Sequence, residues 1–233
     1  RMPAGNVTLY GKWTQEKLDV TTTKTATRTR GDELVVLPNN GTVRVGDTIT
    51  YSVTFENTGN TALGKYGVLN GVEEFLGQGS MEYELKGQKV TVGNANNGGS
   101  PHTFKIADIN EFAPNAKITY VFTYEVTEAD ETAGTITNKA YAKTSVLNPG
   151  ATMPSTKFFP IAKHEVTVEQ RHTVEYQYET TGLSADVVEK LPQLPADNEK
   201  YYAGDMVLVK NEPDDQTIDG IKYTFAGWYV GST

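Results

Sequence analysis

The sequence predicts a mainly β protein, and three observations carry this prediction. Long stretches alternate apolar and polar residues, turn-forming residues separate these stretches at short intervals, and threonine and tyrosine are abundant. β-branched and aromatic side chains pack well on a pleated sheet, so this composition favours strands. The one segment that favours a helix is residues 184–191, which Ser184 can cap and Pro192 ends.

The strongest strand pattern covers residues 48–55, where Ile, Tyr, Val and Phe alternate with Thr and Ser. A turn is expected directly after it, at Asn57-Thr58-Gly59-Asn60. Many short strands with turns between them are typical of β-sandwiches and small β-rich modules. The other strands are expected at residues 118–126, 136–142 and 174–178, with shorter ones at 34–37, 81–85, 89–92, 102–106 and 206–209.

Length and charge limit the functions that are open to the chain. Its 233 residues suit one large domain or two smaller ones, each able to bury a core. A formal net charge of −8 without a Lys/Arg cluster argues against nucleic acid and anionic membranes as partners. Cysteine is absent, which excludes disulfides, thiolate metal sites and cysteine nucleophiles. No apolar run is long enough to predict a transmembrane helix.

Proline and glycine gather near residues 146–161, and this shift in composition predicts a linker over residues 148–171. The linker would separate a β-sandwich at residues 15–147 from a smaller domain at residues 172–233. Residues 1–14 are expected to form a short segment of their own.

Two stretches near the ends of the chain carry a family resemblance. Residues 2–13, MPAGNVTLYGKW, and residues 223–229, YTFAGWY, both resemble parts of the internalin-type B-repeat, which occurs in tandem on bacterial surface proteins. Their order here is the reverse of the order within one repeat. We therefore expect residues 1–14 to end one repeat and residues 172–233 to begin the next.

The alternative is that Trp13 and Trp228 anchor the core of a single domain whose ends meet. Residues 172–233 are also similar to tandem surface repeats of streptococcal type. Both resemblances imply a small β-rich module, β-grasp-like with one short helix. Such a module would lack its closing strand here, so we expect residues 5–13 of a neighbouring molecule to complete it by strand addition.

The middle of the chain resembles a second surface module. Residues 17–146 are similar to a conserved bacterial repeat domain of unknown function, which forms immunoglobulin-like sandwiches in the stalks of exported proteins. The resemblance rests on these stretches, in this order: LDVTTTKT at 18–25, VGDTITY at 45–51, VTFENTGN at 53–60, FAPNAKITY at 112–120 and GTITNKA at 134–140. It implies an immunoglobulin-like β-sandwich.

Related pilin and adhesin sandwiches carry a lysine–asparagine isopeptide bond, which a buried acid catalyses. The resemblance therefore implies a candidate bond between Lys24, in the first strand, and Asn138, at an inward position of the last strand. Asp47 is the candidate acid, because it shares its strand face with Ile49 and Tyr51. The alternative is that Lys24 is solvated and that Asn138 makes an ordinary hydrogen bond.

No other pattern of residues predicts chemistry. His102, His164 and His172 are scattered without the spacing of metal ligands, and the acidic stretch at residues 214–220 is typical of a solvated turn. Glycine-rich phosphate loops and nucleophile elbows are absent from the sequence. We therefore expect no enzyme, no cofactor and no metal site.

The sequence as a whole favours a non-enzymatic stalk or spacer segment of an adhesin-like protein on the bacterial cell surface or cell wall. Its expected partners are neighbouring repeats of the same chain. The alternative is an adhesive binding module that recognises a host protein or a glycan through the sandwich loops at residues 57–79 and 94–101.

Overall fold

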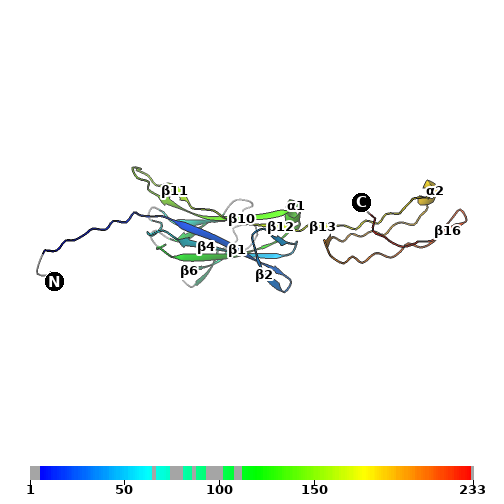
Figure 1. The fold of residues 1–233 in the computed structure, drawn as a ribbon, viewed down its shortest axis with the longest axis horizontal. Coiled ribbons are helices and arrows are strands. Elements are labelled where there is room, and N and C mark those ends of the chain that lie inside the picture. The colour runs from blue at the N-terminus through cyan, green and yellow to red at the C-terminus, as the bar shows by residue number, and fades with distance from the viewer. Residues whose placement is uncertain are drawn as a thin grey trace. The chain divides into compact units, whose positions relative to one another are not determined.

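The protein is mainly β, as predicted, and its chain divides into two compact units, Arg1–Glu169 and Gln170–Thr233 (Figure 1). The structure is a computed structural model, and it describes residues 6–64, 67–73, 81–85, 88–92, 102–107 and 112–231. The N-terminal unit is a β-sandwich, and the C-terminal unit is smaller and less regular. Each unit is described by itself.

One sheet of the sandwich is antiparallel throughout, with the strand order β2-β1-β4-β9-β6-β7. The long strands β1 and β4 pair from Val20–Asn57 at one end to Thr29–Thr48 at the other. The bounds of the six strands are β1 Val20–Arg30, β2 Glu33–Leu37, β4 Thr48–Asn57, β6 Met81–Leu85, β7 Gln88–Val92 and β9 Lys117–Glu125.

The second sheet has the order β3-β12-β10-β5-β8, and β11 also pairs with β10. Its pairs are antiparallel except for β12 and β3, which run parallel. A short helix, α1 (Glu128–Ala133), connects the two sheets between β9 and β10. The strand bounds are β3 Gly41–Val43, β5 Leu69–Glu73, β8 His102–Ala107, β10 Thr135–Val146, β11 Ser155–Phe158 and β12 Ala162–Val168.

The core of the sandwich lies between the two sheets. Alternate residues of β4, β9 and β10 are buried there, which is the face that the alternation predicts. Aromatic rings from neighbouring strands pack together in this core: Tyr51 stacks on Phe122 with centroids 5.3 Å apart, and Phe55 meets Tyr120 edge-on at 5.8 Å. The expected strands over residues 48–55, 118–126 and 136–142 are therefore confirmed.

The segment that was expected to be a linker belongs to the sandwich instead. Residues 148–171 contain β11 and β12, and β12 lies between β10 and β3 in the second sheet. Its inward residues His164, Val166 and Val168 alternate with polar ones, so the strand signal was present in the sequence. The prolines and the glycine before it bound the strands rather than separating two domains.

The C-terminal unit contains little regular structure. Its strands form two small sheets, β13 (Arg171–His172) with β14 (Tyr201–Tyr202) and β15 (Gln216–Ile218) with β16 (Ile221–Tyr223). The expected helix forms as α2 (Ala185–Val188), but the side chain of Ser184 makes no capping hydrogen bond. The strands expected at residues 174–178 and 206–209 pair with no other strand, so these two predictions were wrong.

Candidate functional site

Five side chains form a series of neighbours that leads from one sheet to the other, and we call them the interior cluster: Lys24 of β1, Tyr51 of β4, Phe122 of β9, His164 of β12 and Asn138 of β10. The half-buried Lys24 turns inward, and its Nζ atom lies 4.8 Å from the ring centroid of Tyr51 and 5.0 Å from that of Phe122. An ammonium over two aromatic faces is stabilised by the negative potential of the rings. Lys24 therefore lies against the aromatic part of the core.

Asn138 is the least satisfied polar residue of this cluster. It is completely buried, and neither its Oδ1 nor its Nδ2 atom has a hydrogen-bond partner among the residues that the structure describes. The equally buried Asn57 differs, because its Nδ2 donates to the carbonyl oxygens of Thr61 and Phe112, and its Oδ1 accepts from the backbone N–H of Gly59. A buried amide without partners is unfavourable and rare, so Asn138 needs an explanation beyond packing.

His164 lies directly opposite Asn138 on the neighbouring strand and is also buried. Its Nε2 atom lies 3.0 Å from the carbonyl oxygen of Leu37. A carbonyl oxygen only accepts, so we assign the proton to Nε2, which leaves Nδ1 as an acceptor without a partner. Burial lowers the pKa of His164, the hydrogen bond to Leu37 opposes this, and the charge of Lys24 lowers the pKa further.

The structure brings two of the three predicted site residues into one region. The charge of Lys24 acts on His164, and His164 faces Asn138 across the β10–β12 ladder. Lys24 is half-buried over the rings of Tyr51 and Phe122, and the described residues offer the Asn138 amide no hydrogen-bond partner. The isopeptide bond and its two alternatives stay predictions.

Asp47 does not join this cluster, so the role of acid that the sequence suggested for it needs correction. It sits beside Arg30 at the far end of β1, and six residues of extended strand between Arg30 and Lys24 span roughly 20 Å. Arg30 donates to both carboxylate oxygens of Asp47 at 2.7 Å, and the backbone N–H of Arg44 donates to it at 2.7 Å. Asp47 is thus a buried hydrogen-bond acceptor that stabilises the turn at residues 44–47. Strand parity predicted its burial but not its partner.

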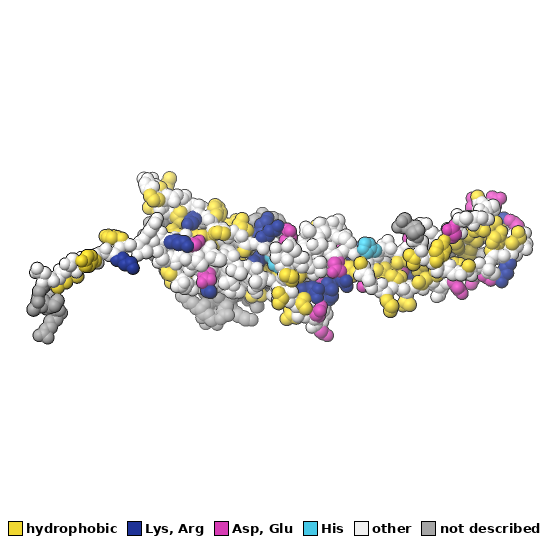
Figure 2. All heavy atoms as spheres, in the orientation of Figure 1, with side chains coloured by type: hydrophobic (Ala, Val, Ile, Leu, Met, Phe, Trp, Pro, Cys, Tyr) yellow, Lys and Arg dark blue, Asp and Glu magenta, His cyan; other side chains and the backbone are white. Residues whose placement is uncertain are grey.

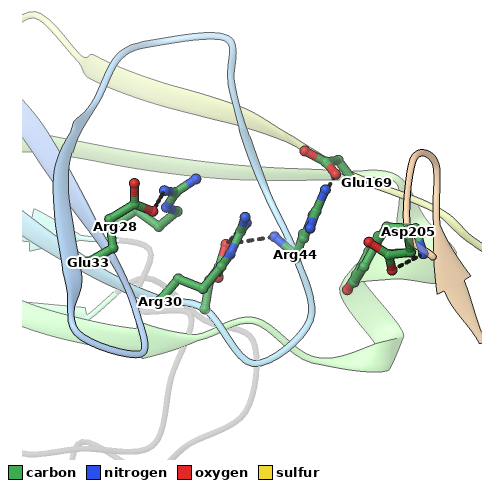
Figure 3. Close-up of polar contacts among 8 residues, drawn as sticks. Arg28, Arg30, Glu33, Arg44, Glu169 and Asp205 are labelled. Atoms are coloured by element: carbon green, nitrogen blue, oxygen red, sulfur yellow. Dashed lines mark hydrogen bonds and ion pairs between the residues drawn. The ribbon is translucent and has the colours of Figure 1, made fainter.

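The same end of the sandwich holds the last residue of the N-terminal unit. The guanidinium Nε of Arg44 donates to Glu169 at 2.7 Å (Figure 3). The backbone N–H of Glu169 donates to the carbonyl oxygen of Val43. The preceding N–H, of Val168, donates to the carbonyl oxygen of Gly134. We call this the Val168 end.

The opposite end, which we call the Val20 end, holds the chain where it joins β1. Lys157 donates from Nζ to the carbonyl oxygen of Leu18 at 2.7 Å, and the N–H of Thr58 donates to the carbonyl oxygen of Asp19. Asn60 accepts from the N–H of Lys17 at 2.7 Å. The predicted turn at residues 57–60 is therefore also an anchor for the strand that enters the sandwich.

The C-terminal unit contains a different feature, an open groove of about 950 Å³. Half-buried aromatic side chains line it, among them Tyr178, Phe225 and Trp228. Hydrophobic side chains spread over the visible face of this unit in Figure 2, and several of them are almost fully exposed, such as Met206 and Leu208. The only buried hydrophobic side chain among the described residues of this unit is Ile218. The groove therefore lies in a unit with very little core.

The described residues include no cluster of three or more His, Asp or Glu side chains that is arranged to hold a metal ion. The helices in the same parts of the chain are all too short or too polar to cross a membrane. Of the binding loops in the alternative hypothesis, residues 94–101 lie outside the described residues, as do residues 65–66 and 74–79 of the loop at 57–79, so that hypothesis stays a prediction.

Sequence reasoning missed His164 as a member of the interior cluster. The histidine was considered only as a metal ligand, and its segment was expected to be a linker. The signal that could have found it is its inward position in the alternation with Val166 and Val168.

No protein-family model and no curated protein matches this chain. The resemblances to bacterial surface repeats therefore stay predictions, which rest on the quoted motifs.

Proposed function

We propose that this chain is a non-enzymatic spacer segment of a bacterial cell-surface protein, in which the β-sandwich carries tension along its strands. The observation that carries the proposal is the position of the two points where the chain joins and leaves the sandwich. Val20 pairs with Asn57 at one end, and Glu169 binds Val43 and Arg44 at the other. A tensile load on the flanking segments would therefore act along the sandwich rather than across it.

The direction of the two terminal strands determines how this load is shared. β1 and β12 both run from the Val20 end to the Val168 end. Pulling the two flanking segments apart therefore slides β1 along β4 and β2, and slides β12 along β10 and β3. Ladder hydrogen bonds lie roughly across the strands, so sliding loads a whole ladder at once. A strand that is peeled sideways loses its hydrogen bonds one after another instead.

Single-molecule pulling along two directions tests the proposal. The chain has no cysteine, so a pair of introduced cysteines defines the direction of force. Gln15→Cys with Gln170→Cys loads the sandwich from end to end, and both side chains are exposed. Gln15→Cys with Lys117→Cys places both handles at the Val20 end, where Lys117 pairs with Glu56, and so peels the sheet. We expect a clearly higher rupture force for the first pair. Equal forces in the two directions would contradict the proposal.

We propose in addition that Lys24 and Asn138 form an intramolecular isopeptide bond. The observation that supports this is the buried Asn138 amide without partners, in the same cluster as an inward-facing lysine. The bond would connect β1 with β10 and so join the two sheets covalently. Tension that reaches β1 would then pass into the second sheet through a covalent bond.

The chemistry needs a base for the lysine ammonium. Nδ1 of His164 would accept one proton from Nζ of Lys24, and the free amine would then attack Cγ of Asn138. The attacking nitrogen passes a second proton to the amide nitrogen, the C–N bond to that nitrogen breaks, and it leaves as ammonia, which takes the first proton back from His164 as ammonium. No oxidant or cofactor is required. Asp47 has no part in this step, because it lies at the Val168 end.

Intact-mass measurement of the full chain tests the bond. A linked chain is lighter than its calculated mass by one ammonia, whereas hydrolysis of the Asn138 side chain would make the chain slightly heavier. We expect Lys24→Gln and Asn138→Ala to restore the mass calculated for each variant, and Asn57→Ala to keep the deficit. His164→Gln should slow or abolish the reaction. A wild-type chain of full calculated mass would exclude the bond and leave the spacer proposal intact.

A further inference from the structure

We propose that residues 6–14 of one copy of this chain bind the groove of the C-terminal unit of a second copy. The contact would be head-to-tail, because the binding segment and the groove are different surfaces. Heterologous contacts of this kind build open chains when they do not close into a ring. The proposal goes beyond the spacer function, since it concerns assembly and not the response to force.

The binding segment is apolar and fully available. Residues 6–19 form neither a helix nor a paired strand, and residues 6–17 are exposed (the dark-blue trace in Figure 1). Leu9, Tyr10 and Trp13 are 90%, 91% and 95% exposed. Val7 and Leu9 have the spacing of side chains on one face of a strand. A large apolar surface of this kind is costly in water and favours a binding partner.

The groove offers what such a segment needs. Its lining includes half-buried Tyr178, Leu191, Phe225 and Trp228, which can bury apolar side chains. Tyr223 of β16 also lines it. Among the described strands β16 pairs only with β15, so one edge of this hairpin is open to an added strand. Main-chain hydrogen bonds to a sheet edge, with pockets for alternate side chains, are a general way to bind an extended segment.

Charge is complementary between the two surfaces. The groove lining includes the carboxylates of Glu175, Glu179 and Asp214, and it includes no lysine or arginine. Lys12 is the only charged residue within residues 6–14. In the proposed contact, the one charged side chain of an otherwise uncharged segment would therefore meet an acidic groove. This match argues for a copy of the same chain as the occupant rather than for an acidic or uncharged partner.

The experiment is sedimentation velocity of the full chain over a concentration series. We expect the wild type to associate as concentration rises. Val7→Asp with Leu9→Asp should abolish association without affecting the sandwich, because both side chains are exposed. The matched control is Leu34→Asp with Val36→Asp on β2, which places the same charges at exposed alternate positions of another strand. The control should associate like the wild type.

A charge exchange makes the test specific for the groove. Lys12→Glu alone should associate less than the wild type, and Glu175→Lys with Asp214→Lys should do the same. In a mixture of these two variants, the acidic segment of the first copy meets the basic groove of the second. The Lys12 segment of the second copy meets the unchanged acidic groove of the first, so both contacts pair opposite charges. We expect the mixture to associate more strongly than either variant alone.

Three outcomes would overturn the proposal. The first is a wild-type chain that stays monomeric at every concentration. The second is association that survives the Val7 and Leu9 substitutions, or a mixture that associates no better than its components. The third is a monomer in which, on a Trp13→Phe background that leaves Trp228 as the single tryptophan, Val7→Asp with Leu9→Asp changes the fluorescence, because the segment would then occupy the groove of its own chain.

Discussion

The sandwich and the C-terminal unit contain similar alternating patterns, but only in the sandwich do the patterns become paired strands. The stretch at residues 48–55 pairs on both sides, with β1 and with β9. The stretch that contains Val174, Tyr176 and Tyr178 alternates as well, yet it pairs with no strand. Alternation therefore predicts which face a segment can bury, and a strand forms only where a neighbouring edge is present to pair with it.

The aromatic side chains of the two units show the same difference. In the sandwich, Tyr51 and Phe55 are completely buried between the sheets. In the C-terminal unit, Trp228 meets Tyr176 and Phe225 edge-on at 4.7 and 4.8 Å, but all three rings stay half-buried. The C-terminal rings thus form a small cluster at the surface instead of a core.

The largest expected effect follows from truncating a core ring of the sandwich. Phe55→Ala removes a completely buried side chain and should lower the free energy of unfolding of the sandwich by about 3–5 kcal/mol. Trp228→Ala should leave the unfolding transition of the sandwich unchanged, because it alters only the C-terminal cluster. Urea titration followed by circular dichroism measures the sandwich transition in both variants.

The two tryptophans provide an independent signal for this comparison. Trp13 and Trp228 both lie outside the sandwich strands, so tryptophan fluorescence follows the other parts of the chain. We expect Phe55→Ala to shift the circular dichroism transition and leave the fluorescence transition in place. A common shift of both signals would show that the two units unfold together.

The second effect concerns the buried carboxylate at the Val168 end. Arg30→Ala would leave Asp47, which is 1% exposed, without the two guanidinium donors and the positive charge that face it. The expected loss is about 2–3 kcal/mol of unfolding free energy, because a buried charge without its partner is unfavourable. Arg28→Ala is the control, since its partner Glu33 is exposed. Equal losses in the two variants would contradict the importance that we assign to Asp47.

The sequence predicted the fold of the sandwich better than its polar contacts. Strand β4 followed from alternation alone, and even the inward position of Asn138 followed from parity. Parity could not show that Arg30 reaches Asp47, since this contact depends on the register between β1 and the turn before β4. Strand β12 was missed because the nearby prolines indicated a linker, although they only bound its strands. The alternation within a strand thus predicted which side chains face inward. The hydrogen-bond partners of those side chains depend on contacts between segments that are distant in the sequence.

A smaller effect is expected at the glycine of the turn that anchors the Val20 end. A Cβ atom on Gly59 would lie 2.2 Å from the carbonyl oxygen of Lys17, so the backbone would have to move. Gly59→Ala should lower the unfolding free energy by about 1–2 kcal/mol through overpacking. Gly231→Ala in the C-terminal unit is the matched control, because no atom lies within 4 Å of its Cβ position. A Gly59→Ala chain as stable as this control would show that the backbone of Lys17 can move away from the added Cβ atom without loss of unfolding free energy.

The smallest effect is a pH dependence that distinguishes a buried histidine from an exposed one. The folded pKa of His164 is lowered, chiefly by burial, so below about pH 6.5 the unfolded chain binds more protons than the folded one. The stability that the neutral His164 contributes is therefore complete above that pH and decreases as the pH falls toward the folded pKa. The charge of Lys24 lowers the pKa further in a chain without the Lys24–Asn138 bond, and in a linked chain burial alone remains as the cause, so the direction of the effect is the same in both.

The urea midpoint of the sandwich transition should accordingly fall between pH 7.5 and pH 5.5 in the wild type. His164→Gln should reduce this fall, because the unfolded state of the variant gains no proton at this position. His172→Gln should leave it unchanged, since His172 is exposed in the C-terminal unit. If His164→Gln and the wild type show the same dependence, the loss of stability comes from carboxylates, and the interior cluster does not sense pH. The same pair of variants therefore separates a titration inside the sandwich core from one at the surface.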